Sequence, residues 1–524
     1  MRRFIFSLAL ICSYAFQGAY SLTGMEESME IQREQLERLN DFLGPVNVPS
    51  GPAKRQSSIT FSNPAAEQFF VDGTTIPLVD FDAGPSWSGL MPISADPNET
   101  RKLFFWFWPT TNVSNGDNLV FWTNGGPGCS SLEGFLQENG PISWSWGQSA
   151  PTPNQWSWTN LSHVLWVEQP VGTGFSQGTP NITNDDELAA QVRVLALQEL
   201  KGKNFYVTGE SVKTFFGLLH ELKLTIIEQY AGFYVPYIAN WIYEHPGLDL
   251  DLKGIWIADP YDKNVLQHDE IPALRFVQAN QNLFPFNSSF LAELQTISDT
   301  CGYTDYLDNF VTYPPAGQLP LPVATNGTFT VTPACRIHNM IEREIGILNP
   351  AFDVYRVSDT FPVVWSVLGF PRSTQEFIYF NRTDVQDAIH APHIVWEICA
   401  SRSVYLPGGD QSIPSTLSVL PNVIEKSERV VIVHGLADFI LVAEGTRIAI
   451  QNMTWNGAQG FQTPIEPETF TLKNMGVYGN THTERNLTYV EFYFSGHMTP
   501  QFVPWAAFST ISYLLGLQDS PSSG

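Results

Sequence analysis

Short runs of apolar residues recur along the chain from about Ile59 onward. Such runs are typical of strands that are covered on both faces, as in a parallel or mixed sheet with helices on each side. The pattern therefore predicts an α/β fold with a central, mostly parallel sheet. The predicted strands are Leu103–Trp108, Leu119–Thr123, Val164–Glu168, Asn204–Thr208, Gly254–Ala258 and Arg429–Gly435.

Residues 261–425 break this rhythm, because they are rich in Pro, Asn, Asp and Tyr and lack a clear series of apolar runs. We interpret this stretch as a cap that is inserted between two parts of one core. The two parts are residues 59–260 and 426–520.

The N-terminus has the pattern of a secretory signal peptide over residues 1–21. Arg2 and Arg3 precede the apolar run Phe4–Phe16, which is too short to span a membrane. Residues 22–58 then form an N-terminal segment in which Lys54-Arg55 is either a propeptide processing site or part of an ordinary linker. We expect a secreted protein, with a vacuolar location as the alternative, and no membrane anchor. N-glycans are expected at the sequons Asn98, Asn112, Asn160, Asn181, Asn287, Asn326, Asn381, Asn452 and Asn486.

The composition narrows the class of function. The 524 residues include 52 Asp and Glu against 27 Lys and Arg, which gives a formal net charge of −25. Nucleic-acid binding requires a basic face, so the charge argues against it. A strongly acidic chain suits work at low pH, where protonation relaxes self-repulsion, although an acidic surface can also serve solubility alone.

Four cysteines remain once Cys12 leaves with the signal: Cys129, Cys301, Cys335 and Cys399. An even number in an oxidising compartment predicts disulfides, and four cysteines allow three pairings. Their spacings do not match a zinc site, and we expect no metal.

Two segments carry the residues of a nucleophile site. The strand Asn204–Thr208 runs into Gly209-Glu210-Ser211, the start of a strand-to-helix turn that exposes a serine hydroxyl. Directly after another strand, Trp122–Ser131 reads WTNGGPGCSS. Consecutive glycines let backbone N–H groups point into a cleft, as an oxyanion hole requires.

An acid and a base follow later strands. Asp438 comes after Arg429–Gly435, and His497 comes after Val490–Phe494. The order Ser211, Asp438, His497 is that of an α/β-hydrolase, in which the histidine is the general base and the aspartate fixes its tautomer. His434 lies on the same loop as Asp438 and is the rival base.

Together these segments resemble the serine carboxypeptidase family, of α/β-hydrolase fold. The resemblance runs from about Trp87 to Leu517 and includes WTNGGPGCSS, with Thr123 where the family usually has Leu, together with EQPVGTGFS, ADF and GHMTP. It implies a serine-type carboxypeptidase that releases C-terminal residues from peptides through an acyl-enzyme at acidic pH, without a cofactor. The alternatives are an acyltransferase on the same scaffold and a catalytically impaired glycoprotein with a binding or structural role.

The resemblance also implies roles for individual residues. Asn124 and the Gly125 N–H would bind the substrate's terminal carboxylate, together with the paired acids Glu138 and Glu210. The Gly126 N–H and the N–H of the residue after Ser211 would form the oxyanion hole. The resemblance further implies the disulfides Cys129–Cys399 and Cys301–Cys335.

The chain departs from the family immediately after Ser211. The family motif continues Tyr-Ala-Gly, whereas here Val212-Lys213-Thr214 follows and Tyr230-Ala231-Gly232 appears 18 residues later. Removing residues 212–229 restores GESYAGFYVPYIANW, and Tyr230 then becomes the residue after Ser211. The ends of this apolar segment can be encoded as an intron donor and acceptor, so we hypothesise a translated, unspliced intron. Because Lys213 occupies a place that needs a small residue, the chain as written is expected to be impaired.

Overall fold

The structure of the chain is a computed structural model that describes residues 61, 64–192, 201–210, 231–248, 250–260, 269–322, 331–361, 366–369 and 378–522. The residues described below, apart from 471–477, belong to one compact unit made from 52–470 and 478–522.

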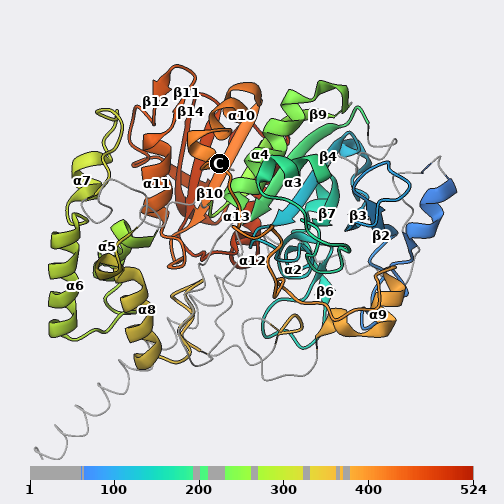
Figure 1. The fold of residues 1–524 in the computed structure, drawn as a ribbon, viewed down its shortest axis with the longest axis horizontal. Helices are drawn as coiled ribbons and strands as arrows, with labels where there is room; N and C mark the ends of the chain where they lie inside the picture. The colour runs from blue at the N-terminus through green and yellow to red at the C-terminus, as the bar shows by residue number, and fades with distance from the viewer. Residues whose placement is uncertain are drawn as a thin grey trace, which may run out of the picture. The chain divides into compact units, whose positions relative to one another are not determined.

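The predicted apolar runs form the middle of one large sheet (Figure 1). Its strands follow the order β1-β2-β3-β7-β4-β8-β9-β10-β15-β14. The bounds are β1 Phe70–Val71, β2 Ser86–Pro92, β3 Lys102–Trp108, β4 Asn118–Asn124, β7 His163–Glu168, β8 Asn204–Glu210, β9 Asp251–Ala258, β10 Arg429–Gly435, β14 Gly476–Glu484 and β15 Leu487–Phe492. The remaining strands, all short, are β5 Ile142–Ser143, β6 Thr152–Pro153, β11 Thr454–Trp455, β12 Ala458–Gln459 and β13 Thr469–Leu472.

Adjacent strands from β7 through β4, β8, β9 and β10 to β15 pair in parallel. The pairs β2–β3, β3–β7 and β14–β15 are antiparallel. The sheet is therefore mixed, with a parallel centre, as the apolar runs predict. Loops that leave the carboxyl ends of the parallel strands meet at one edge, where open α/β sheets bind ligands.

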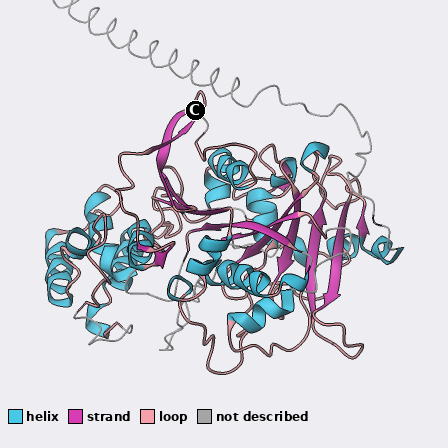
Figure 2. Ribbon diagram, turned by 90° about the horizontal axis from the view of Figure 1, so that it is seen from above, coloured by secondary structure: helices cyan, strands magenta, loops and turns pink. Residues whose placement is uncertain are grey.

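Helices lie on both sides of the strands (Figure 2). Helix α4 packs against β8 and β9, whereas α13 packs against β9 and β10. The helices are α2 Leu132–Gly134, α3 Asp185–Val192, α4 Ala231–Glu244, α5 Ile271–Ala279, α6 Ser288–Cys301, α7 Tyr306–Phe310, α8 Ile337–Leu348, α9 Thr383–Ala388, α10 Leu420–Lys426, α11 Ala443–Asn452, α12 Thr499–Phe502 and α13 Pro504–Leu514.

The described part of the predicted cap, 261–425, contains helices but no strand. Helices α5, α6 and α8 contact one another, and α11 of the core contacts α5. Within the described part of the chain, no helix is both long and apolar enough to cross a bilayer.

The elements on either side of the predicted insert are those that a nucleophile turn needs. Strand β8 ends at Glu210, helix α4 begins at Ala231, and α4 packs against β8. The predicted signal peptide, the segment 22–58, Lys54-Arg55, Ser211, the insert 212–229 and Tyr230 lie outside the described residues.

Candidate active site

An acid–histidine pair lies at the carboxyl ends of β10 and β15. Asp438 follows β10 and His497 follows β15, and both side chains are fully buried. The Nδ1 atom of His497 is 2.7 Å from Oδ2 of Asp438, while Oδ1 of Asp438 accepts from the Leu441 N–H at 3.1 Å. The His497 backbone N–H donates to the Tyr355 carbonyl at 2.7 Å, which fixes the loop that carries the imidazole. The pair is thus held before any substrate binds.

The rival histidine, His434, has other partners. Its Nδ1 lies 2.9 Å from the Thr446 hydroxyl, and its Nε2 lies 2.9 Å from the Leu441 carbonyl. Its Nε2 is 3.8 Å from the Asp438 carboxylate, a longer separation than that of His497. His434 therefore braces the loop after β10 and is not the closer partner of Asp438.

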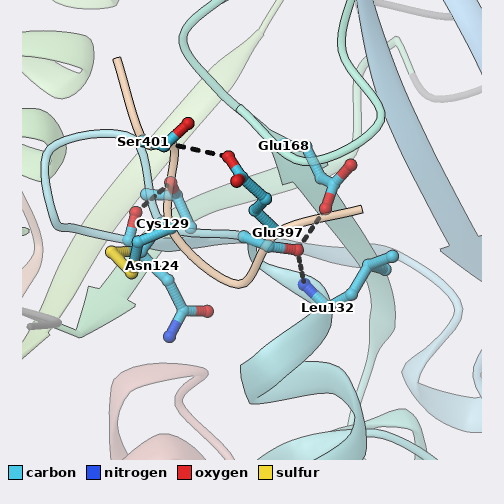
Figure 3. Close-up of a disulfide and its surroundings, with 9 residues drawn as sticks. Asn124, Cys129, Leu132, Glu168, Glu397 and Ser401 are labelled. Carbon is cyan, nitrogen blue, oxygen red and sulfur yellow. Dashed lines mark hydrogen bonds between the residues drawn. A yellow bond between two sulfur atoms is a disulfide. The ribbon is translucent and has the colours of Figure 1, made fainter. Parts of the chain in front are cut away.

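The glycine-rich loop follows β4 and is tied to a distant segment. Cys129 forms a disulfide with Cys399 across a sequence separation of 270 residues (Figure 3). The Ala400 N–H donates to the Gly128 carbonyl at 2.8 Å, and the Ser130 N–H donates to the Ile398 carbonyl at 2.7 Å. Gly126 has a φ of +120°, a region that favours glycine, and a Cβ there would lie 2.7 Å from the Cys129 nitrogen. The loop therefore has one fixed, glycine-dependent shape.

The second disulfide, Cys301–Cys335, joins the end of α6 to the residues before α8. Both disulfides have the pairing that the family resemblance implies. The described residues contain no other cysteines.

Three buried polar side chains meet beside this loop: Asn124, Glu138 and Glu210. Asn124 ends β4, Glu210 ends β8, and the two residues are paired in the sheet register. Glu138 comes from a π-helical turn over Phe135–Asn139. We call these three residues the carboxyl trio.

Trp122 and Gly134 fix the orientation of the Asn124 amide. The Trp122 Nε1–H donates to Oδ1 of Asn124 at 2.8 Å, which leaves the Asn124 NH₂ group as the free donor. A Cβ on Gly134 would lie 2.4 Å from Trp122 Nε1 and 2.9 Å from Asn124 Oδ1. Glycine at 134 therefore lets the following turn, with Glu138, approach the end of β4.

Among the described residues, the carboxyl groups of Glu138 and Glu210 and the NH₂ group of Asn124 have no hydrogen-bond partner outside the trio. Burial raises the pKa of Glu138, and a hydrogen bond from Glu210, the charge of His497 and the Asn124 amide lower it in part. Burial and the neighbouring Glu138 raise the pKa of Glu210 well above its usual range. A hydrogen bond between two carboxyl groups needs a proton, which Glu138 and Glu210 share.

The Gly125 N–H, which the resemblance assigns to carboxylate binding, donates to the Glu210 carbonyl at 2.8 Å. This bond continues the β4–β8 ladder beyond Asn124 and couples the glycine loop to the strand that precedes Ser211.

Glu168 ties three segments together near the same loop. Its carboxyl group accepts from Ser130 Oγ, the Phe175 N–H and, at 3.2 Å, Trp396 Nε1. Burial raises the pKa of Glu168 to about 7, although its donors lower it in part. The EQPVGTGFS segment is therefore bound to the glycine loop and to the segment that leads to Cys399.

Sequence reasoning overlooked Asp259, the first residue after β9. Asp259 is fully buried, and one carboxylate oxygen each of Asp259 and Asp438 and one ring nitrogen of His497 lie within 4.8 Å of one another. In the sequence, Asp259-Pro260 reads as an ordinary turn. An acidic residue directly after a buried parallel strand was the available signal, because such strand ends meet at the site.

A mixed sheet with a parallel centre, an acid after β10 and a histidine after β15 defines an α/β-hydrolase. A sequence profile described as serine carboxypeptidase matches residues 78–516. The chain therefore belongs to the serine carboxypeptidase family.

Relatives and solved structures agree with this assignment. A probable serine carboxypeptidase of Arthroderma benhamiae is 42% identical over 503 residues, which covers 90% of each chain. Serine-type carboxypeptidase F of Aspergillus niger is 40% identical over 486 residues, covering 85% of this chain and 86% of the other. The crystal structure of a prohormone-processing carboxypeptidase from Saccharomyces cerevisiae superposes with a TM-score of 0.66 at 21% identity, covering 87% of this chain and 97% of that one. At this identity the structural match supports the α/β-hydrolase fold alone.

Proposed function

We propose that the protein is a serine carboxypeptidase that releases C-terminal residues from peptides at acidic pH. The observation that carries the proposal is the carboxyl trio beside the glycine loop, because it offers a buried amide donor and a proton-sharing acid pair to a ligand. A substrate's free carboxylate fits such donors only while the pair retains its proton.

Ser211 is the proposed nucleophile, and His497 is its general base. Asp438 holds the Nδ1–H of His497, so that Nε2 is the ring nitrogen that accepts the Ser211 proton. Attack on the last peptide bond forms an acyl-enzyme, and the released amino acid takes its amine proton from His497. A water molecule, activated by the same imidazole, then frees the shortened peptide.

The oxyanion of each tetrahedral intermediate is proposed to bind the Gly126 N–H and the N–H of Tyr230, the residue that follows Ser211 without the insert. Asn124, Glu138 and Glu210 bind the terminal carboxylate, and the Gly125 N–H becomes a further donor only if it gives up its bond to the Glu210 carbonyl. The fixed shape of the glycine loop supports this assignment, since oxyanion donors must be preorganised.

We further propose that residues 212–229 are a translated intron and that the mature enzyme lacks them. The end of β8 and the start of α4 support this, because the two elements of the turn are formed on either side of the segment. Sequencing the transcript across codon 211 tests the idea, and a transcript that retains all 54 bases would defeat it.

The test of the function compares the chain as written with a form that lacks residues 212–229. The shortened form is expected to hydrolyse a blocked dipeptide in acid and to react with a fluorophosphonate at Ser211. Ser211→Ala in the same form should abolish both reactions, and the chain as written should react much more slowly. Absence of both reactions from the shortened form would refute the proposed function.

We also propose secretion or vacuolar delivery with N-glycosylation. The N-terminal pattern supports delivery, and Asn98, Asn112, Asn181, Asn287 and Asn486 are exposed positions for glycans. Endoglycosidase treatment of the protein isolated from its natural source, with fractionation of medium and vacuoles, tests both points. An unchanged mobility after that treatment would remove the glycan proposal.

A further inference from the structure

Asp259 has a backbone conformation that is strained for most residues. Its φ is +46°, in the left-handed region that few residues other than Gly, Asn and Asp adopt. Its backbone N–H donates to the Val433 carbonyl at 2.9 Å, so the residue is held between β9 and β10. The conformation leaves its carboxyl group at the end of both strands, beneath the loop that carries Asp438.

Two N–H groups lie near the Asp259 carboxyl group, and both face the same oxygen, Oδ1. The Gly435 N–H donates to Oδ1 at 3.0 Å, and His434 Nε2 lies 3.3 Å from it. Because His434 Nε2 also faces the Leu441 carbonyl, this nitrogen carries the ring's hydrogen. Because Oδ1 accepts from the Gly435 N–H and also faces the His434 N–H, a proton on this carboxyl group belongs on Oδ2.

The remaining oxygen, Oδ2, is buried and has no hydrogen-bond partner among the described residues, whereas the Asp438 carboxyl group lies within hydrogen-bonding reach of Asp259. Two ionised carboxylates in that position would repel each other in a medium of low dielectric constant. A proton on Oδ2 removes the repulsion and turns the contact into a hydrogen bond to Asp438.

We propose that Asp259 is a positioning residue, protonated on Oδ2, which donates a hydrogen bond to Asp438 and so sets the orientation and basicity of the Asp438–His497 pair. The proposal rests on the function proposed above, since it assigns a task within the same site. Asp438 is then held from three sides, by Asp259, the Leu441 N–H and His497.

The electrostatic surroundings agree with a neutral Asp259. Burial, the charge of Asp438 and that of Glu138 raise the pKa of Asp259 well above its usual range, although the Gly435 N–H lowers it in part. Among the described residues, other titratable groups that act on or respond to Asp259 are His434 and His497, Glu210 on β8 and Tyr489 on β15. None of the acidic groups among them would favour a second negative charge.

The experiment uses the full chain without substrate and the variants Asp259→Asn and Asp259→Leu. Asparagine tolerates the left-handed backbone, accepts from Gly435 through Oδ1 and donates to Asp438 through its amide, so the fold is retained. Leucine has no donor. Asp384→Asn is the matched control, because the guanidinium of Arg382 lowers the pKa of Asp384 and keeps it ionised.

The first readout is the infrared carbonyl band of protonated carboxyl groups at about pH 5. Asp259→Asn should lose intensity in this band relative to the full chain, whereas Asp384→Asn should not. Equal intensity in Asp259→Asn and the full chain would overturn the proposal.

The second readout is the pKa of His497, followed by NMR and assigned through His497→Gln. Asp259→Asn should leave this pKa within about half a unit, whereas Asp259→Leu should raise it by about one unit, because Asp438 loses its donor. A fall of about one unit or more in Asp259→Asn would show that Asp259 is normally charged, and would contradict the proposal. Because neither readout needs turnover, both signatures together with an inactive form that lacks residues 212–229 would overturn the proposed function but not this inference.

Discussion

Two regions of the site contain paired buried carboxyl groups, and they differ in what else those groups contact. At the ends of β9, β10 and β15, Asp438 has fixed protein partners in the Leu441 N–H and His497 Nδ1. At the ends of β4 and β8, the carboxyl groups of Glu138 and Glu210 have no hydrogen-bond partner outside the carboxyl trio among the described residues. A buried carboxyl group whose bonds are made within the protein is preorganised for catalysis, whereas one without such bonds has capacity left for a ligand.

The largest expected effect is on catalysis by the first region. In the form that lacks residues 212–229, His497→Gln should lower kcat by roughly a thousandfold or more, because the nucleophile loses its base. KM should change little, since His497 is not part of the carboxyl trio. Initial rates with a blocked dipeptide measure both constants, and a large rise in KM at unchanged kcat would reverse the roles of the two regions.

Glu168 is another buried carboxyl group, and like Asp438 it has hydrogen-bond donors within the protein. We expect it to affect the stability of the fold. Its pKa is raised by burial from 4.5 to about 7, so the folded chain binds this proton more tightly than the unfolded chain. The stabilisation is therefore complete in acid and is lost as pH rises from the unfolded value through about 7. The loss is on the order of 3 kcal/mol, about a hundredfold in the unfolding equilibrium.

Urea unfolding of the full chain at several pH values measures this loss. Glu168→Gln should be less stable in acid, because its amide cannot accept from every donor, and its stability should depend less on pH. Equal pH slopes in the variant and the unaltered chain would show that Glu168 does not bind the proton in question.

The carboxyl trio is expected to have a smaller effect, on the pH dependence of KM. Above the raised pKa of Glu210, both acids of the trio ionise and repel the substrate's carboxylate, so KM should rise by about tenfold as the pH passes through it. Glu210→Gln cannot ionise, so its KM should stay nearly constant over the same range. Glu270→Gln alters another buried glutamate, which accepts from the His338 N–H, and should keep the unaltered KM profile. A Glu210→Gln variant that retains the full rise in KM would place the titrating group elsewhere.

Most of the central sheet could be predicted from the sequence, because its parallel strands are covered on both faces and read as unbroken apolar runs. The prediction of Arg429–Gly435 agrees with β10 at both ends. Strand β14, GVYGNTHTE, was not predicted, because an antiparallel strand near the sheet edge needs few apolar residues and here reads as a loop.

The site was predictable to the extent that its residues stand in motifs at strand ends, as Asn124, Asp438 and His497 do. Asp259 was not predicted, because its contribution depends on the contacts of its carboxyl group with Gly435 and Asp438. Such contacts arise only when β9 and β10 lie side by side. The pairing of the four cysteines likewise depends on the fold, and only the family resemblance predicted it.

The most direct measurement of the central claim compares a blocked dipeptide that has a free C-terminal carboxylate with the same peptide as its C-terminal amide. In the form that lacks residues 212–229, KM for the acid should be lower than for the amide at about pH 4.5 and should rise toward about pH 8. KM for the amide should remain nearly flat, because it brings no negative charge to Glu138 and Glu210. Parallel pH profiles for the two substrates would contradict recognition of a terminal carboxylate by the carboxyl trio.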